Sequence, residues 1–193
     1  ERPKRLNTHW GGVIEDNSFG THEFLRLAEL LDAEPYISAN VGSGTPAEMQ
    51  DWIEYMTSDS ESTLAEERRA NGREEPWKIK FFGIGNESWG CGGNMTADYY
   101  ADLYRQFQTY AKNYSGNKLF KIASGWSDSQ YGWTETLMEK AGRMMDGISL
   151  HYYTIAGDDG WFDKGPSMNF GTDWYFGGIL AAYRMDEFVT KHS

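Results

Sequence analysis

Short apolar runs alternate along the chain with longer stretches in which apolar residues recur every three or four positions. The runs are nearly continuously apolar, which predicts strands buried on both faces. They cover residues 36–41, 79–85, 120–125 and 147–153. Strands that alternate with helices predict an α/β fold with a parallel sheet and right-handed crossovers. Such a sheet is either doubly wound or part of a (β/α)8 barrel.

The periodic stretches predict five helices, two of which carry clear start signals. Residues 45–48 (TPAE) match a capping box with proline in the first turn, and open a helix that runs to about residue 56. A second helix follows Thr96, with one apolar face that extends to Tyr114. The other three are expected to begin near Thr21, Thr134 and Gly178.

The segment 58–75 is polar and charged, and predicts a surface excursion within one connection. No internal repeat, low-complexity tract or proline-rich linker divides the chain, so residues 1–193 are expected to lie within one domain without an internal boundary. Four strands cannot close a barrel, which takes about 250 residues. The sequence therefore predicts the middle portion of a larger fold.

The charge balance narrows the classes of partner. The chain has 18 Lys and Arg against 29 Asp and Glu, a formal net charge of −11, which argues against nucleic acid. No apolar run approaches the roughly 20 residues that cross a bilayer, so no membrane contact is expected. We expect any targeting segment to precede residue 1, which leaves open the cytoplasm, the periplasm or secretion in a bacterium.

The aromatic content is high, at 16%, with eight Trp and twelve Tyr. Such side chains mostly fill cores, but Trp and Tyr also provide flat faces on which sugar rings pack. The composition therefore favours carbohydrate weakly. A single cysteine, Cys91, excludes an internal disulfide and a Cys-rich zinc site.

Polar or aromatic residues follow each predicted strand, at the edge where parallel α/β folds carry their sites. Glu87 comes after the second strand, between Asn86 and Trp89. An apolar neighbour favours the protonated form of a carboxylic acid, and an amide can hold a substrate hydroxyl group. This arrangement suits general acid catalysis. The alternative is a surface glutamate in a turn.

Four other residues near strand ends are candidates with open interpretations. His151 is either a hydrogen-bonded structural residue or a catalyst. Asn40 either binds a ligand or braces its loop. Asp128 is expected to be a helix-capping or loop residue, and Cys91 is expected to pack against its loop rather than act as a nucleophile.

Several kinds of site are excluded by their motifs. Residues 83–88 fail the dinucleotide fingerprint at its last glycine, and neither a P-loop nor a G-x-S-x-G elbow occurs. His22 and Glu23 lack the second histidine of a zinc protease motif. An acidic loop contains Asp158, Asp159 and Asp163. Its residues lack the spacing of an EF-hand and predict a solvated turn, so no metal site is expected.

Three segments resemble family 51 glycoside hydrolases: residues 14–24 (IEDNSFGTHEF), 83–95 (GIGNESWGCGGNM) and 148–153 (ISLHYY). These enzymes are mostly α-L-arabinofuranosidases built on (β/α)8 barrels of the large retaining clan. The Asn-Glu pair identifies only the clan, whereas the two longer strings are specific to the family. The resemblance runs through essentially the whole chain. It implies that residues 1–193 are a partial (β/α)8 catalytic domain that covers about strands three to six.

The resemblance also assigns the chemistry of the site. Glu87 is similar to the family's general acid/base, and Asn86 to the amide that bonds the sugar 2-hydroxyl. The nucleophilic glutamate of strand seven and the Arg-x-x-Gly-Gly motif of strand two have no counterpart here. Retaining hydrolysis needs two carboxyl groups about 5–5.5 Å apart, so this chain alone is expected to be inactive. Glu187 falls in the last predicted helix and cannot replace the nucleophile.

Four further residues match substrate-binding positions of the family. His151 and Tyr153 resemble the pair near the nucleophile on strand six, where the tyrosine would hydrogen-bond the nucleophilic carboxylate. Trp89 and Trp126 would line the sugar pocket. The resemblance implies no metal and no organic cofactor.

The expected activity is release of terminal α-L-arabinofuranosyl residues from arabinan, arabinoxylan or arabino-oligosaccharides. The expected partner is therefore an arabinose-containing oligosaccharide or polysaccharide, together with a homo-oligomer at full length, because related enzymes are often oligomeric. Two alternatives stay open. One is another retaining clan member, such as a β-glucanase or xylanase, and the other is a non-catalytic carbohydrate-binding protein.

Overall fold

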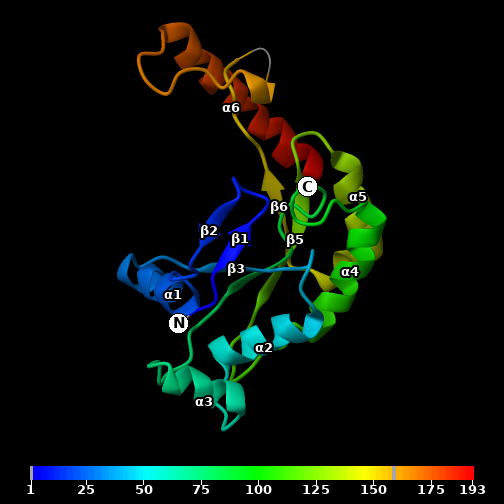
Figure 1. Cartoon of the computed structure of the whole chain (residues 1–193). Coiled ribbons are helices and arrows are strands. Elements are labelled where there is room, and N and C mark those ends of the chain that lie inside the picture. Colours follow the sequence, from blue (N-terminus) through cyan, green and yellow to red (C-terminus); the bar gives the residue numbers. More distant parts are fainter. Residues whose placement is uncertain (1, 158–159) are drawn as a thin grey trace.

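A four-stranded parallel sheet organises the computed structural model, which describes residues 2–157 and 160–193. The strands pair in chain order, β3-β4-β5-β6, without a reversal. A parallel sheet wound in one direction places its crossover helices on a single face, as barrels do and doubly wound sheets do not. The predicted α/β class is therefore confirmed (Figure 1). The strands are β3 (Tyr36–Ala39), β4 (Phe81–Ile84), β5 (Phe120–Ser127) and β6 (Gly147–His151).

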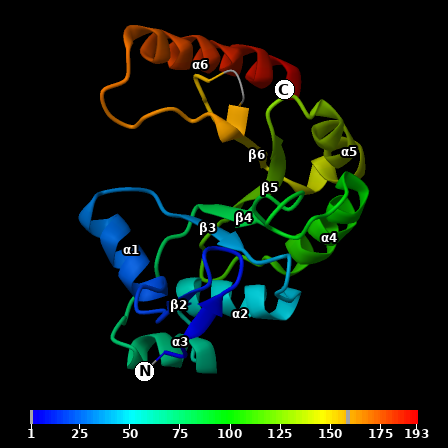
Figure 2. The same ribbon diagram turned by 45° about the horizontal axis from the view of Figure 1, so that its top comes forward.

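The helices form an arc around the outer side of the sheet, with α6 beyond β6 (Figure 2). The predicted start of α2 is confirmed, because Thr45 Oγ1 accepts from the backbone of Glu48 while the Glu48 carboxylate accepts from that of Thr45. Thr96 caps α4 with its side chain alone, since its Oγ1 accepts from the backbone of Tyr99. The helices of this arc are α1 (Thr21–Leu30), α2 (Pro46–Thr57), α4 (Ala97–Tyr110), α5 (Tyr131–Ala141) and α6 (Thr172–His192).

The core lies between the sheet and α2, α4 and α5. Its fully buried side chains come from alternate strand positions and from the inner helix faces: Phe82, Ile84, Ala123, Ile53, Met56, Tyr100, Tyr104 and Leu137. Helix α1 is only partly buried, because Leu25 and Ala28 are buried while Leu27 is 43% exposed. His22 of α1 packs edge-on against Trp77, in the chain that leads into β4, at a centroid distance of 4.9 Å.

The segment 58–75 lies within the connection between β3 and β4 and is mostly exposed, as predicted. The prediction missed that it contains helix α3 (Thr63–Ala70), whose Arg68 is completely buried. A buried guanidinium needs hydrogen-bond acceptors. Arg68 donates to four backbone carbonyl oxygens, those of Tyr55, Ser58, Arg73 and Glu74.

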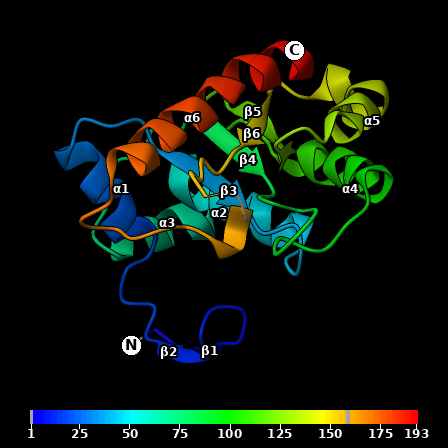
Figure 3. The same cartoon turned by 90° about the horizontal axis from the view of Figure 1, so that it is seen from above.

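Two further features differ from the predicted elements: a hairpin that was not predicted and the start of α6. An antiparallel hairpin of β1 (Arg5–Asn7) and β2 (Val13–Glu15) precedes α1 and stands apart from the sheet (Figure 3). Its strands are three residues long, too short to produce a recognisable alternation. Helix α6 begins at Thr172 rather than near Gly178.

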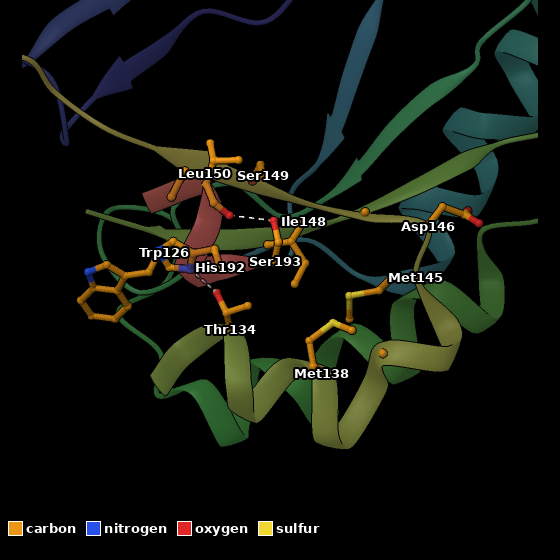
Figure 4. Close-up of a pocket in the computed structure, with 13 residues that line it drawn as sticks. Trp126, Thr134, Met138, Met145, Asp146, Ile148, Ser149, Leu150, His192 and Ser193 are labelled. Atoms are coloured by element: carbon orange, nitrogen blue, oxygen red, sulfur yellow. Dashed lines mark hydrogen bonds between the residues drawn. The ribbon is translucent and has the colours of Figure 1, made fainter. Parts of the chain in front are cut away.

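A cavity of about 390 Å³ lies between α5, β6 and the end of α6. Figure 4 shows Met138, Met145 and Ile148 gathered around it, and the hydrogen bond of 2.8 Å between Thr134 and His192 at its other side. These residues line the helix-facing side of β6. The cavity is thus a gap between the sheet and the helix layer that reaches Trp126 near the end of β5.

Candidate active site

Glu87 stands on a tight turn directly after β4. Gly85 has a φ of +90°, and a β-carbon there would lie 2.7 Å from Ser88 Oγ and 2.8 Å from Val41 Cγ2. Glu87 itself has a φ of +45°, a conformation that L residues other than glycine adopt at a cost. Such local strain is typical of functional sites. The turn points the Glu87 side chain back across the strand ends.

The Glu87 carboxylate is held at both oxygens. Oε1 lies 2.9 Å from Nδ1 of His151, which comes from the end of β6, two strands away. Oε2 accepts a hydrogen bond from the Cys91 thiol over 3.3 Å. The side chains of Glu87 and His151 are 15% and 23% exposed, so the pair is shielded but reachable from solvent. The structure therefore brings together two of the predicted site residues.

The interpretation of Cys91 as a side chain packed against its loop is wrong. Cys91 is exposed, and its thiol contacts Glu87. The hydrogen bond to Glu87, together with the partial burial of the thiol and the Glu87 charge, raises the pKa of the Cys91 thiol. It therefore stays protonated and can donate.

Two tryptophans stack on each other after β4 and at the end of β5. The ring of Trp89 stacks on that of Trp126 with centroids 4.7 Å apart and an interplanar angle of 27°. Trp89 Nε1 donates to the carbonyl oxygen of Gly125, and Trp126 packs edge-on against buried Trp133. The predicted pocket residues are thus neighbours, fixed from behind by the core.

The turn after β4 is tied to β5 by buried hydrogen bonds. The Tyr100 hydroxyl donates to the carbonyl oxygen of Ile84 and accepts from the backbone of Ser124. Ser124 Oγ accepts from the backbone of Ser88 over 3.2 Å. Burial raises the pKa of the Tyr100 phenol, which keeps it neutral. The ends of two adjacent strands are therefore held in a fixed relation.

The remaining predicted residues lie farther from the carboxylate or have other contacts. Asn40 braces its loop, since its Oδ1 accepts from the backbone of Ser43 over 3.0 Å. Asp128 is a loop residue with a φ of +64°, while α5 is capped at Gln130. Asn86 is exposed beside Glu87. Tyr153, beyond the end of β6, is 54% exposed.

Glu187 lies on α6, as expected, and accepts hydrogen bonds from Lys191 and Tyr131. The acidic turn is only partly covered, because Asp158 and Asp159 lie outside the described residues. Among residues 2–157 and 160–193, no three or more His, Cys, Asp or Glu side chains are placed to hold a metal ion. In the same ranges, no helix combines the length and apolar character that a membrane span requires.

The model of the alpha-L-arabinofuranosidase 1 domain matches residues 1–164. The chain belongs to the α-L-arabinofuranosidases of glycoside hydrolase family 51. An intracellular exo-alpha-L-arabinofuranosidase of Bacteroides ovatus is 56% identical over 191 residues, which are 99% of this chain and 37% of that protein. A probable alpha-L-arabinofuranosidase C of Aspergillus terreus is 33% identical over 172 residues, 82% of this chain and 34% of that protein.

Solved structures agree with this assignment. The family 51 arabinofuranosidase from Xanthomonas axonopodis pv. citri superposes with a TM-score of 0.94 at 50% identity, and covers 100% of this chain and 38% of its own. The arabinose complex of the Thermotoga maritima α-L-arabinofuranosidase gives 0.82 at 32% identity, with coverage of 100% and 36%. The chain thus spans less than two fifths of the length of these relatives.

Proposed function

We propose that the complete enzyme that contains this chain is a retaining α-L-arabinofuranosidase in which Glu87 is the general acid/base. The proposal rests mainly on the position of the Glu87 carboxylate. Glu87 lies on a strained turn at the end of β4, and its carboxylate is hydrogen-bonded to His151. Trp89, two residues further along the same turn, stacks on Trp126 of β5. A shielded carboxyl group at the end of a parallel strand suits proton transfer to a bound sugar.

The reaction has two steps, and Glu87 serves both. In the first, the Glu87 carboxylic acid protonates the departing glycosidic oxygen while a glutamate outside residues 1–193 attacks the anomeric carbon. In the second, the Glu87 carboxylate removes a proton from water, which hydrolyses the glycosyl-enzyme. His151 shares a hydrogen bond with Oε1 and so fixes the direction in which the other oxygen faces.

The other site residues bind the sugar in this proposal. Asn86 holds the 2-hydroxyl, and Tyr153 lies near the nucleophile, whose carboxylate it bonds. Trp89 and Trp126 line the pocket. The strands β3 to β6 take the places of strands three to six in the barrel, so the nucleophile of strand seven would follow β6 around the ring.

The substrate class follows from the family and from the name of one relative. The Bacteroides ovatus protein is named an exo-acting enzyme. We propose by analogy that terminal α-L-arabinofuranosyl groups of arabinan, arabinoxylan or arabino-oligosaccharides are released, without metal or organic cofactor. The same proposal includes a homo-oligomer of the complete enzyme.

The test is Glu87→Gln in the complete enzyme. The loss of a general acid slows turnover of arabino-oligosaccharides by about 10²–10⁴-fold. Glycosylation by a 4-nitrophenyl arabinofuranoside suffers far less, because its leaving group needs no proton. Glu187→Gln is the matched control and leaves both rates unchanged, since Glu187 pairs with Lys191 on α6. Near-normal oligosaccharide turnover in Glu87→Gln would overturn the assignment.

A panel of aryl glycosides separates the clan alternatives. Hydrolysis of arabinofuranosides but not of glucosides or xylosides is the expected result, because a furanose pocket rejects larger pyranose rings. Preference for a pyranoside would identify another clan activity. Arabino-oligosaccharide binding without any hydrolysis would identify a binding protein.

A further inference from the structure

Cys91 is the single cysteine of the chain, and its thiol lies at the carboxylate that the proposed function uses. The Sγ–Oε2 distance of 3.3 Å is a normal length for a thiol hydrogen bond to oxygen. The opposite oxygen, Oε1, faces His151. In the described residues, these are the two titratable groups that bond the Glu87 carboxylate, one from β6 and one from its own turn.

The backbone of the turn places this thiol. The carbonyl oxygen of Glu87 accepts hydrogen bonds from the backbone N–H groups of Gly90 and Gly92, over 2.8 and 3.0 Å. Cys91 lies between the two donors, so the turn carries its side chain back over Glu87. A β-carbon on Gly92 would lie 1.9 Å from the carbonyl oxygen of Asn86, so the turn closes only with glycine there.

We propose that Cys91 is a positioning residue for the acid/base, whose S–H group orients Oε2 of Glu87 in both steps of the reaction. The inference rests on the proposed function. Glu87 must be protonated in the first step and ionised in the second. An arginine or lysine at this place would hold the carboxylate ionised throughout. A thiol is a weak donor and a weak acceptor, so it bonds either form of the carboxyl group without strongly favouring one.

The test compares Cys91→Ala and Cys91→Ser in the complete enzyme, with arabino-oligosaccharide as substrate. Alanine removes the donor and makes the ionised carboxylate less favourable. The basic limb of kcat/KM, where the acid loses its proton, therefore moves to higher pH by about half a unit. Serine keeps an O–H donor, so the basic limb of Cys91→Ser stays close to that of the wild type.

The second step gives an independent readout. When hydrolysis of the glycosyl-enzyme limits kcat, Glu87 must be ionised, so the acidic limb of kcat for Cys91→Ala also moves to higher pH. At pH values below this limb, kcat falls about threefold, which corresponds to half a pH unit. A movement of both limbs in the same direction identifies one titrating group. A merely structural cysteine would lower the rate at every pH without moving either limb.

Unchanged limbs in Cys91→Ala, or a serine variant that shifts as far as the alanine variant, would overturn the inference. If Cys91→Ala does not fold, the exposed thiol of the folded wild type is blocked with methyl methanethiosulfonate instead. Blocking removes the S–H donor, so the same shift is expected, and a rate loss without a shift contradicts the proposal. Glu87→Gln separates failure of the Cys91 inference from failure of the proposed function. If Glu87→Gln retains oligosaccharide turnover, the proposed function fails as well.

Discussion

Glu87 after β4 and Tyr153 after β6 are both predicted site residues, but they are held very differently. After β4, Glu87 is fixed by its turn, by His151 and by the buried bonds of the β5 end. After β6, Tyr153 is half-exposed, and its ring packs edge-on against Trp161 at a centroid distance of 5.1 Å. The contrast follows the position of each strand in the sheet.

Strand β4 lies between β3 and β5, whereas β6 pairs only with β5 in the part of the chain that the structure describes. An inner strand receives hydrogen bonds on both sides, and the turn beyond it can be supported by both neighbours. Ser124 and Gly125 of β5 provide such support for the β4 turn. The precision of a strand-end site thus depends on what lies on each side of its strand.

The largest effect on the turn after β4 is expected from Gly92→Ala. The new β-carbon would lie 1.9 Å from the Asn86 carbonyl oxygen and 2.9 Å from that of Glu87, so the turn must move. Overpacking of this kind costs about 1–3 kcal/mol, and a displacement of the acid/base by about 1 Å lowers kcat/KM on the order of 100-fold. Urea unfolding and steady-state kinetics of the complete enzyme measure the two effects.

Gly132→Ala is the matched control for Gly92→Ala. Gly132 lies inside α5, and a β-carbon there meets no atom within 4 Å. Alanine favours a helix interior, so stability rises slightly and activity is unchanged. Equal activity losses in the two variants would show that the fit of Gly92 does not matter.

The next largest effect is expected from Tyr100→Phe, which tests the buried link between β4 and β5. The variant leaves the Ile84 carbonyl oxygen and the Ser124 N–H without their partner, which costs about 2–3 kcal/mol. Tyr104→Phe on the same helix removes one partly buried hydrogen bond, to Met144, and costs about 1 kcal/mol. Equal unfolding midpoints for the two variants would contradict the special role of Tyr100.

The smallest effects on stability are expected at the β6 end, where two adjacent tyrosines differ. Tyr153→Phe changes the free energy of unfolding by less than about 0.5 kcal/mol, because its ring is half-exposed, but lowers kcat about tenfold if it bonds the nucleophile. Tyr152→Phe removes a hydrogen bond of 2.8 Å to the Ala181 carbonyl oxygen, which costs about 1 kcal/mol. Its activity is unchanged. An activity loss in Tyr152→Phe with normal activity in Tyr153→Phe would show that Tyr152, and not Tyr153, belongs to the site.

Much of the fold could be predicted from the sequence because its signals are local. The four strands are recognisable as apolar runs, and the start of α2 as a capping box at Thr45. Helix α3 could not be found in this way, since its charged residues read as a solvated surface. The burial of Arg68 depends on carbonyl groups that only the folded backbone brings together.

The candidate site was partly predictable for a similar reason. Parallel strands bring their carboxyl ends to one edge, so Glu87 and His151 were both expected at that edge, but the contact between them was not predicted. The family resemblance placed His151 near the nucleophile. In the structure, the His151 side chain is hydrogen-bonded to Glu87. The Cys91 contact was missed because it depends on the curl of a glycine-rich turn, which leaves no periodic signal.

The four backbone carbonyl oxygens that accept hydrogen bonds from Arg68 affect how this chain tolerates insertions and deletions. These four acceptors come from the end of α2, from the loop after it and from the chain that leads into β4. A lysine offers a point charge instead of a planar fork and cannot reach the same set. The connection between β3 and β4 therefore behaves as one unit that an insertion or a deletion disrupts as a whole, although its composition suggests a dispensable loop.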